Sequence, residues 1–284
     1  MIIQMEHVHA GRLIRNNIIF YPTFYIFKNK HFMKDSLGDR IKSDYEDRTR
    51  FSLPRRSYTI IRIDGKAFHT YTKGLVKPFD DGLMEDMDLT AMYLCKNIMG
   101  SKFAFVQSDE ISILLTDFEE IGTQSWFDSN LQKICSVSAS MSTRIFNECR
   151  LKRNGLEKMR WAEFDSRVFQ IPQKTEVENY FIWRQKDSTR NSISSVAQSL
   201  YSHKELNNKN SDEQQELIFQ KGINWNDYAS KYKRGRIIIK ETYKKEPEEN
   251  DKSEESIRTR WITVEVPIFT QNREFISEKI PNNL

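Results

Sequence analysis

The sequence predicts an α+β fold in which helices cover one face of an antiparallel sheet. Three observations lead to this prediction. An apolar, β-rich run at residues 58–63 is typical of a strand, and residues 80–99 have a helical pattern. Two more apolar runs, 103–106 and 111–115, enclose turn-forming residues and predict a hairpin. A strand, a helix and a hairpin in this order are expected to form the core of the fold.

The segments around this core predict further helices and strands. A charged stretch at 37–51 is expected to be helical and to end before Pro54. Beyond the hairpin the expected elements are a long helix (125–149), a strand (164–171), a mostly helical segment (174–201) and an alternating strand (261–268). The fold is therefore expected to carry helical additions to its sheet.

The chain is expected to divide into four parts. Residues 1–32 form an extension, 33–243 the main domain, 244–256 a charged flexible loop, and 257–284 a strand and tail that return to the fold. The extension contains one acidic residue among basic and aromatic ones, which favours an organellar presequence and a mitochondrial location. An ordinary surface extension on a cytoplasmic protein is the competing interpretation, because the segment is poor in serine.

Composition argues against several classes of protein. A chain of 284 residues, 38% hydrophobic and 30% charged, resembles a soluble globular protein, and no apolar run approaches the roughly 18–20 residues that cross a bilayer. No membrane partner is expected. The net charge of +4 is too small to establish nucleic-acid binding by itself. Three cysteines without CxxC spacing and only five histidines argue against a zinc site and favour a reducing compartment.

Carboxylates stand at the end of the first predicted strand and in the hairpin turn. Asp64 ends the strand with Gly65 directly behind it, and Asp109 and Glu110 lie in the turn. Mg²⁺ prefers oxygen ligands, and two such ions can activate a hydroxyl and neutralise a leaving pyrophosphate. Asp64 and Asp109 are therefore the expected ligands of two Mg²⁺ ions, with the Gly65 carbonyl open to a metal. Glu110 is expected either as a third ligand or as an outer carboxylate, because successive strand residues point to opposite faces.

This arrangement is typical of a polymerase- or cyclase-like palm. The alternative is that Asp-Gly and Ser-Asp are simply common turn dipeptides. Basic residues that could contact a triphosphate are Lys66, His69, Lys77 and Lys133. The stretch 77–80 could equally be a helix start capped by Asp80 or Asp81.

Five segments, taken in order, resemble the tRNA-histidine guanylyltransferase superfamily, the reverse (3′-to-5′) nucleotide polymerases. They are RIDGKAFH (62–69), KPFD (77–80), QSDEISILL (107–115), FDSRVF (164–169) and YFIWRQKD (180–187). The resemblance covers roughly residues 33–240, which is most of the chain. It implies a polymerase-like palm with extra helices, assembled as a homotetramer.

The resemblance also implies roles for individual residues. Asp64, Asp109 and Glu110 would be catalytic, and Asp64, Gly65 and Asp109 would hold the metals. The nucleotide-binding positions would be Lys66, Ala67, Phe68, His69, Lys77, Ser108 and Lys133. ATP or GTP would activate a tRNA 5′-monophosphate, the 3′-hydroxyl of an incoming nucleoside triphosphate would attack it, and pyrophosphate would then be removed.

One segment departs from the family members dedicated to histidine tRNA. Those members carry His-Ile-Asn-Asn after the WRQ motif, whereas this chain has Thr189 at the histidine position and keeps Asn191. The segment resembles instead the guanylyltransferase-like branch, which repairs or edits tRNA with an incomplete or mismatched 5′ end, using the 3′ strand as template. The tRNA-binding candidates are Arg190, Asn191, Lys221 and Arg234.

Three alternatives stay open. The enzyme could add the extra 5′ G to histidine tRNA, or the palm could bind tRNA or nucleotides without catalysis. A forward-acting palm enzyme such as a nucleotide cyclase shares the metal geometry but has no use for the WRQ segment. Two basic clusters, 150–160 and 231–236, are candidates for RNA contact, although charged runs are usually solvated faces.

Overall fold

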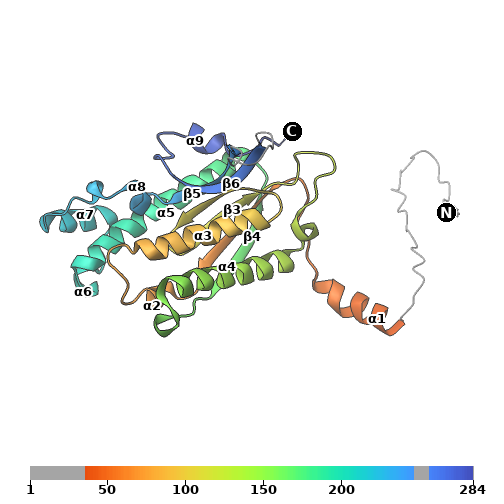
Figure 1. Cartoon of the computed structure of the whole chain (residues 1–284), viewed down its shortest axis with the longest axis horizontal. Coiled ribbons are helices and arrows are strands. Elements are labelled where there is room, and N and C mark those ends of the chain that lie inside the picture. Colours follow the sequence, from red (N-terminus) through yellow and green to blue (C-terminus); the bar gives the residue numbers. More distant parts are fainter. Residues whose placement is uncertain (1–35, 246–255, 284) are drawn as a thin grey trace, which may run out of the picture. The chain divides into compact units, whose positions relative to one another are not determined.

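The computed structural model describes residues 36–245 and 256–283 (Figure 1). The chain divides into two compact units, residues 1–48 and 49–284. In the first unit α1 (Ser36–Ile41) continues as a π-helical turn (Lys42–Glu46) and then a 3₁₀ turn (Asp47–Thr49). The helical prediction for 37–51 is confirmed, whereas the predicted extension, 1–32, lies outside the described residues.

Six strands form one sheet in the second unit, in the order β4-β1-β3-β2-β5-β6, and every neighbouring pair is antiparallel. The strands are β1 (Tyr58–Gly65), β2 (Ser101–Gln107), β3 (Glu110–Leu115), β4 (Phe164–Ile171), β5 (Arg236–Lys245) and β6 (Ser256–Glu265). Helix α3 (Asp81–Asn97) connects β1 to β2, and α4 (Leu131–Asn154) precedes β4. The first four strands and these two helices have the split βαβ arrangement of ferredoxin-like folds, and the β5–β6 hairpin extends the sheet.

Helices α3 and α4 pack on one face of the sheet (Figure 1). Because side chains alternate along a strand, Ile61 and Ile63 of β1 point to this face. They meet Met87 and Leu94 of α3 and Phe146 of α4 in one buried cluster. This layer is the helix-covered palm that the sequence predicts.

The opposite face of the sheet is also covered, so the expectation of helices on one face only was incomplete. Tyr58 and Ile60 of β1 point to this face and pack with Val177 and Phe181 of α5 (Lys174–Leu200). The C-terminal segment, with α9 (Glu274–Ser277), joins the same cluster through Phe269. The reason is that β1, β2 and β3 are apolar on both faces, and an apolar face needs a covering layer.

The helical additions pack along the C-terminal half of α5. They are α6 (His203–Leu206), α7 (Ser211–Gln220), a 3₁₀ turn (Trp225–Asp227) and α8 (Ser230–Lys233). Their small core contains Ile193 and Val196 of α5, Ile218 of α7 and Trp225. Another short helix, α2 (Phe68–Tyr71), follows β1. No helix in the described parts of the chain is long and apolar enough to cross a membrane.

Two predicted boundaries shift. The helix predicted at 125–149 begins only at Leu131, because Asn130 caps it by accepting the Lys133 N–H at 2.9 Å. A separate 3₁₀ turn (Trp126–Ser129) precedes the cap, and a short one (Leu156–Lys158) follows α4. The predicted loop 244–256 is shorter, since Lys244 pairs with Ile257 and extends the β5–β6 ladder. Residues 246–255 of that loop lie outside the described residues.

Candidate active site

Asp64 and the hairpin turn meet at one end of the sheet. Asp64 is paired with Glu110 in the register of β1 and β3, and the backbone N–H of Gly65 donates to the Asp109 carbonyl at 3.2 Å. The hairpin turns with only two residues, and the first, Ser108, has a left-handed φ of 46°. Carboxylates far apart in the sequence thus lie at the same end of the sheet, as the sequence predicts.

The two aspartates have an electrostatic environment that favours a cation. Burial raises the pKa of Asp109 to about 6, and the neighbouring carboxylates of Asp64 and Glu110 add to this rise. The pKa of Asp64 is raised by burial and then by Asp165, which is paired with it across β4. Both aspartates are therefore easier to protonate than free ones, and a divalent cation between them would relieve the same repulsion.

The donor set fits Mg²⁺. Within residues 36–245 and 256–283, no group of three or more His, Cys, Asp and Glu side chains is placed to hold a metal. Mg²⁺ does not need such a cage, because water and substrate phosphates usually complete its shell around one or two carboxylates. Asp64 and Asp109 supply two hard oxygen donors, and the Gly65 carbonyl stays a predicted third.

Glu110 is bound by an arginine. Its carboxylate accepts hydrogen bonds from Arg184 of α5, from Nε at 2.7 Å and Nη2 at 2.6 Å, and from Ser112 at 3.2 Å. The Arg184 and Glu110 side chains are only 6% and 9% exposed. Arg184 also pairs with Asp187 at 2.7 Å. Of the two roles expected for Glu110, the structure favours the outer one, in which it ties the hairpin to α5.

A neighbouring aromatic ring leaves no room for a side chain at Gly65. A β-carbon at Gly65 would lie 2.2 Å from the ring of Phe68, which is buried among three other rings. Ala67, between them, has a left-handed φ of 52°. The glycine was expected to leave room for a metal or a triphosphate, whereas its tightest neighbour is this ring. Ala67 and Phe68 therefore help to set the backbone conformation between β1 and α2.

Replacing Gly65 with alanine is expected to lower the free energy of unfolding by about 1–3 kcal/mol, because the added methyl overpacks the Phe68 site. Urea denaturation followed by circular dichroism measures the change. The matched control is Gly122→Ala, because nothing lies within 4 Å of a β-carbon at that position. Equal stabilities for the two variants would contradict the packing explanation.

The carboxylates line a hollow of about 410 Å³, here called the carboxylate hollow. It is lined by Arg62, Asp64, Gln107, Ser108, Asp109, Glu110, Trp183, Arg184, Asp187 and Asn191. Strands β1 and β2, the hairpin turn and one face of α5 therefore contribute to it. The two aspartates predicted as metal ligands lie in its wall, whereas Gly65 does not.

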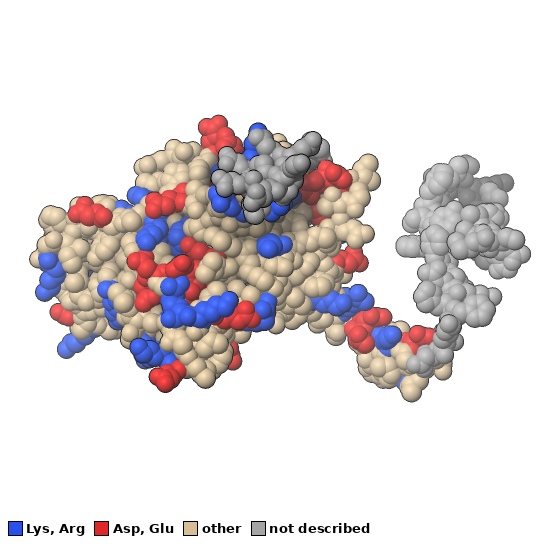
Figure 2. All heavy atoms as spheres, viewed as in Figure 1, with Lys and Arg blue, Asp and Glu red and all other residues tan. Residues whose placement is uncertain are grey.

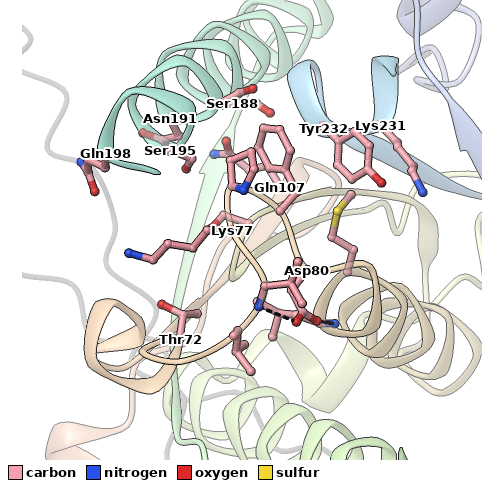
Figure 3. A pocket seen from close by; sticks show the side chains of 18 of the residues that line it. Thr72, Lys77, Asp80, Gln107, Ser188, Asn191, Ser195, Gln198, Lys231 and Tyr232 are labelled. Atoms are coloured by element: carbon pink, nitrogen blue, oxygen red, sulfur yellow. Dashed lines mark hydrogen bonds between the residues drawn. The ribbon is translucent and has the colours of Figure 1, made fainter. Parts of the chain in front are cut away.

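A second hollow, of about 280 Å³ and here called the loop hollow, lies next to it (Figure 3). Its walls come from the loop between α2 and α3, the start of α3, the hairpin turn, α5 and α8. In Figure 3 Lys77 reaches from the loop toward the side chains of α5. Asp80 caps α3 by accepting the Leu83 N–H at 2.7 Å, which confirms the predicted cap.

The predicted nucleotide-binding residues fall into two groups. His69, Lys77 and Ser108 line the loop hollow. Lys66 lies elsewhere and forms an exposed ion pair with Glu163. Lys133 lines neither hollow. It lies in the first turn of α4, and the residue before this helix, Asn130, forms a β-bridge with Ser52. Ser52 precedes the start of β1 in the chain. The structure therefore does not bring Lys133 together with Asp64, which lies near the end of β1.

The four tRNA-binding candidates are dispersed. Asn191 lines both hollows, so its position suits a nucleotide as well as tRNA. Arg190 is 62% exposed and pairs with Asp187. Lys221 lies over the ring of Tyr201, and Arg234 follows α8. Their contact with tRNA stays a prediction.

Four of the nine basic residues in the two clusters form ion pairs with acidic residues of α3. Arg150 and Arg153 both pair with Asp86 of α3, and Arg150 and Asp86 are almost fully buried. In the second cluster Lys231 pairs with Asp81 and Arg236 with Asp88. Figure 2 shows acidic and basic side chains interspersed on the viewed face. These four residues hold α3 against its neighbours, which makes them weaker candidates for RNA contact.

Sequence reasoning missed three residues of the site. Gln107, Arg184 and Asp187 line the carboxylate hollow, and Arg184 connects Glu110 to Asp187. For Arg184 and Asp187 the sequence signal is the WRQKD segment at 183–187. Arg and Asp three positions apart share a helix face, so the motif could have indicated a charged face directed at the hairpin.

The fold and the site together define a class of protein. A palm sheet that sets two carboxylates at its end, next to a hollow with a lysine and a histidine in its wall, has the parts needed for metal-dependent nucleotidyl transfer. Comparison with known proteins gives the family. A model described as tRNAHis guanylyltransferase matches residues 38–172.

Individual relatives agree with that match. The tRNA(His) guanylyltransferase of Debaryomyces hansenii is 30% identical over 213 residues, 69% of this chain and 77% of the relative. A bacterial tRNA(His) guanylyltransferase-like protein solved in complex with ATP is 47% identical, with a TM-score of 0.77 over 87% of this chain and 99% of that one. Its counterpart in complex with GTP is also 47% identical, with a TM-score of 0.71 over 86% and 99%. The chain belongs to the tRNA(His) guanylyltransferase family.

Proposed function

We propose that this protein is a Mg²⁺-dependent nucleotidyltransferase that adds nucleotides in the 3′-to-5′ direction to the 5′ end of tRNA, guided by the opposite strand. The observation that carries the proposal is the meeting of Asp64 and Asp109 in a hollow that adjoins a second one of about 280 Å³. Bound Mg²⁺ would neutralise the phosphates and favour attack by a hydroxyl.

Different residues of the chain would bind the metal, position the hairpin and bind the nucleotide. Asp64, Asp109 and the Gly65 carbonyl would hold the metal, and Arg184 would keep the hairpin in place through Glu110. The triphosphate of ATP or GTP would lie beside Asp64 and Asp109, and Lys77 and His69, in the wall of the loop hollow, would contact the bound nucleotide. Activation joins a nucleotide to the tRNA 5′-phosphate and releases pyrophosphate. The 3′-hydroxyl of the next nucleoside triphosphate then attacks the activated end and displaces that nucleotide.

Two observations favour 5′-end repair over histidine-tRNA maturation. The solved guanylyltransferase-like protein is 47% identical to this chain, whereas the Debaryomyces enzyme named for histidine tRNA is 30% identical. Thr189 also replaces the histidine of the dedicated enzymes, and its hydroxyl donates to the Lys233 carbonyl at 3.2 Å. Addition of the extra 5′ G to histidine tRNA is the second candidate, because the curated relatives carry that name.

The test uses the full chain, Mg²⁺, nucleoside triphosphates and 5′-monophosphorylated tRNAs that lack their first nucleotide. Each tRNA, whether or not it is a histidine tRNA, is expected to gain the nucleotide complementary to its 3′ strand, resolved by gel electrophoresis. A tRNA with a complete, paired 5′ end is the control and should not grow. Extension of histidine tRNA alone would support the second candidate. Nucleotide binding without extension would indicate a non-catalytic palm, and formation of a cyclic nucleotide would indicate a cyclase.

Two further properties belong to this proposal. We propose a homotetramer, which light scattering during gel filtration would show as four times the mass of one chain. We also propose a mitochondrial location directed by residues 1–32, whose fusion to a fluorescent reporter should enter the organelle. A monomer in the first experiment, or a cytoplasmic reporter in the second, would reject the corresponding proposal.

A further inference from the structure

The two hollows share one piece of wall. Gln107, Ser108 and Asn191 line both of them. The metal ligands Asp64 and Asp109 belong only to the carboxylate hollow, whereas the loop and α8 belong only to the loop hollow. Anything that occupies both hollows at once must pass this shared wall.

A nucleoside triphosphate has the right order of parts to occupy both. Its ribose lies between the triphosphate and the base. With the phosphates at the metal ligands and the base in the loop hollow, the ribose comes to lie at the shared wall. This placement rests on the proposed function, which puts the triphosphate beside Asp64 and Asp109.

Gln107 has an unused hydrogen-bond acceptor at this wall. The residue is 2% exposed, and its amide Nε2 lies 3.5 Å from Asp187, at the limit of a hydrogen bond. Its amide oxygen, Oε1, has no hydrogen-bond partner among the described residues. Buried acceptors are almost always satisfied in folded proteins, so this oxygen requires an explanation. Figure 3 shows Gln107 between the α2–α3 loop and α5.

Ribose hydroxyls supply the missing donor. A glutamine carbonyl oxygen only accepts hydrogen bonds, and a ribose hydroxyl can donate one. The last side-chain torsion of glutamine has broad preferences, so the oxygen can turn toward a ligand, and the turn gives up only the 3.5 Å contact of Nε2 with Asp187. We propose that Gln107 accepts a hydrogen bond from a ribose hydroxyl of the bound nucleotide and thereby makes the protein prefer ribonucleotides to deoxyribonucleotides.

The experiment measures binding rather than catalysis. Isothermal titration calorimetry with the full chain and Mg²⁺ compares ATP, 2′-deoxy-ATP and 3′-deoxy-ATP. The wild-type protein is expected to bind ATP about tenfold more tightly than one of the two deoxy analogues, as the loss of one hydrogen bond at a buried site predicts. Gln107→Met, which keeps the length and removes the acceptor, is expected to bind ATP and that analogue equally.

Gln198→Met is the matched control. Gln198 also lines the loop hollow, but it is exposed and does not belong to the shared wall. This variant is expected to keep the wild-type ratio between ATP and the analogue. Equal wild-type affinities for ATP and both analogues would overturn the inference without any variant. An unchanged ratio in folded Gln107→Met would overturn it as well.

The outcomes also separate the inference from the proposed function. ATP binding without discrimination rejects the role of Gln107 and leaves the nucleotide site intact. A wild-type protein that does not bind ATP at all rejects both. Extension of tRNA by the wild-type protein is measured independently. If the protein extends tRNA but binds ATP and both deoxy analogues equally, the proposed function stands and only the role of Gln107 is rejected.

Discussion

Replacing Asp64 or Asp109 with asparagine is expected to lower the rate of 5′-end nucleotide addition by about three orders of magnitude. Each variant keeps the shape of the side chain but removes a negative charge from the proposed metal site, and metal stabilisation of the transition state is worth several kcal/mol. Neither variant should unfold the protein, because Asp64 is 39% exposed and Asp109 lies in a two-residue turn. Single-turnover extension assays and thermal unfolding measure the two effects.

Asp165→Asn is the matched control for these two variants. Asp165 is paired with Asp64 across β4, but it is 57% exposed and lies outside the carboxylate hollow. Its replacement is expected to change the rate by less than about threefold, in line with the small effects of most exposed substitutions. A loss of activity in Asp165→Asn as large as that in Asp64→Asn would indicate that the metal site includes β4. Substantial activity in Asp109→Asn would show that Asp109 is not a metal ligand.

Replacing Glu110 with alanine is expected to destabilise the protein by about 3–5 kcal/mol, because Arg184 would stay buried without its main partner. Arg184→Ala should have a similar cost. The double variant should lose less than the sum of the two, since the unpaired charge disappears. Urea denaturation of all four proteins gives the coupling free energy. Glu148→Ala, which breaks an exposed pair with Arg144, is the control and should cost no more than about 0.5 kcal/mol.

The same pair predicts how Glu110 affects catalysis. Glu110→Gln keeps the shape of the side chain and some of its hydrogen bonding, so the hairpin should be displaced only slightly. Activity is expected to fall, but the Mg²⁺ concentration for half-maximal activity should stay within about twofold, because both oxygens of the carboxylate already accept hydrogen bonds from Arg184. An increase of tenfold or more in that concentration would indicate that Glu110 is itself a metal ligand.

The parts of the fold that depend on local pattern could be predicted from the sequence. The strand at 164–171 and the helix at 174–201 agree with β4 and α5 within one residue. Apolar periodicity and turn residues determine such elements directly. The meeting of Asp64 with Asp109 was also predictable, because a strand followed by a helix and a hairpin brings those ends together.

The interactions that depend on distant partners could not be predicted. Arg184 and Glu110 are 74 positions apart, and no pattern in either segment shows that one will bind the other. Arg150 and Arg153 form a basic run in the sequence, but after folding both pair with Asp86, and Arg153 also pairs with Glu85. A sequence shows where charges are, whereas only the packed structure shows which of them are paired. The position of Lys133 could not be predicted either, since the first turn of helix α4 lies away from Asp64.

Helix α5 contributes to both the hydrophobic core and the candidate site, because it is one continuous helix that reaches from one to the other. Its first half covers one face of the sheet through Val177 and Phe181. Farther along the same helix Arg184 and Asn191 enter the walls of the hollows. Opening the site by unfolding this helix would therefore also expose a large part of the core, so the site cannot melt as a separate unit. By linkage, a nucleotide that binds only the folded hollows stabilises the whole of residues 49–284, and their common melting temperature should rise with its concentration.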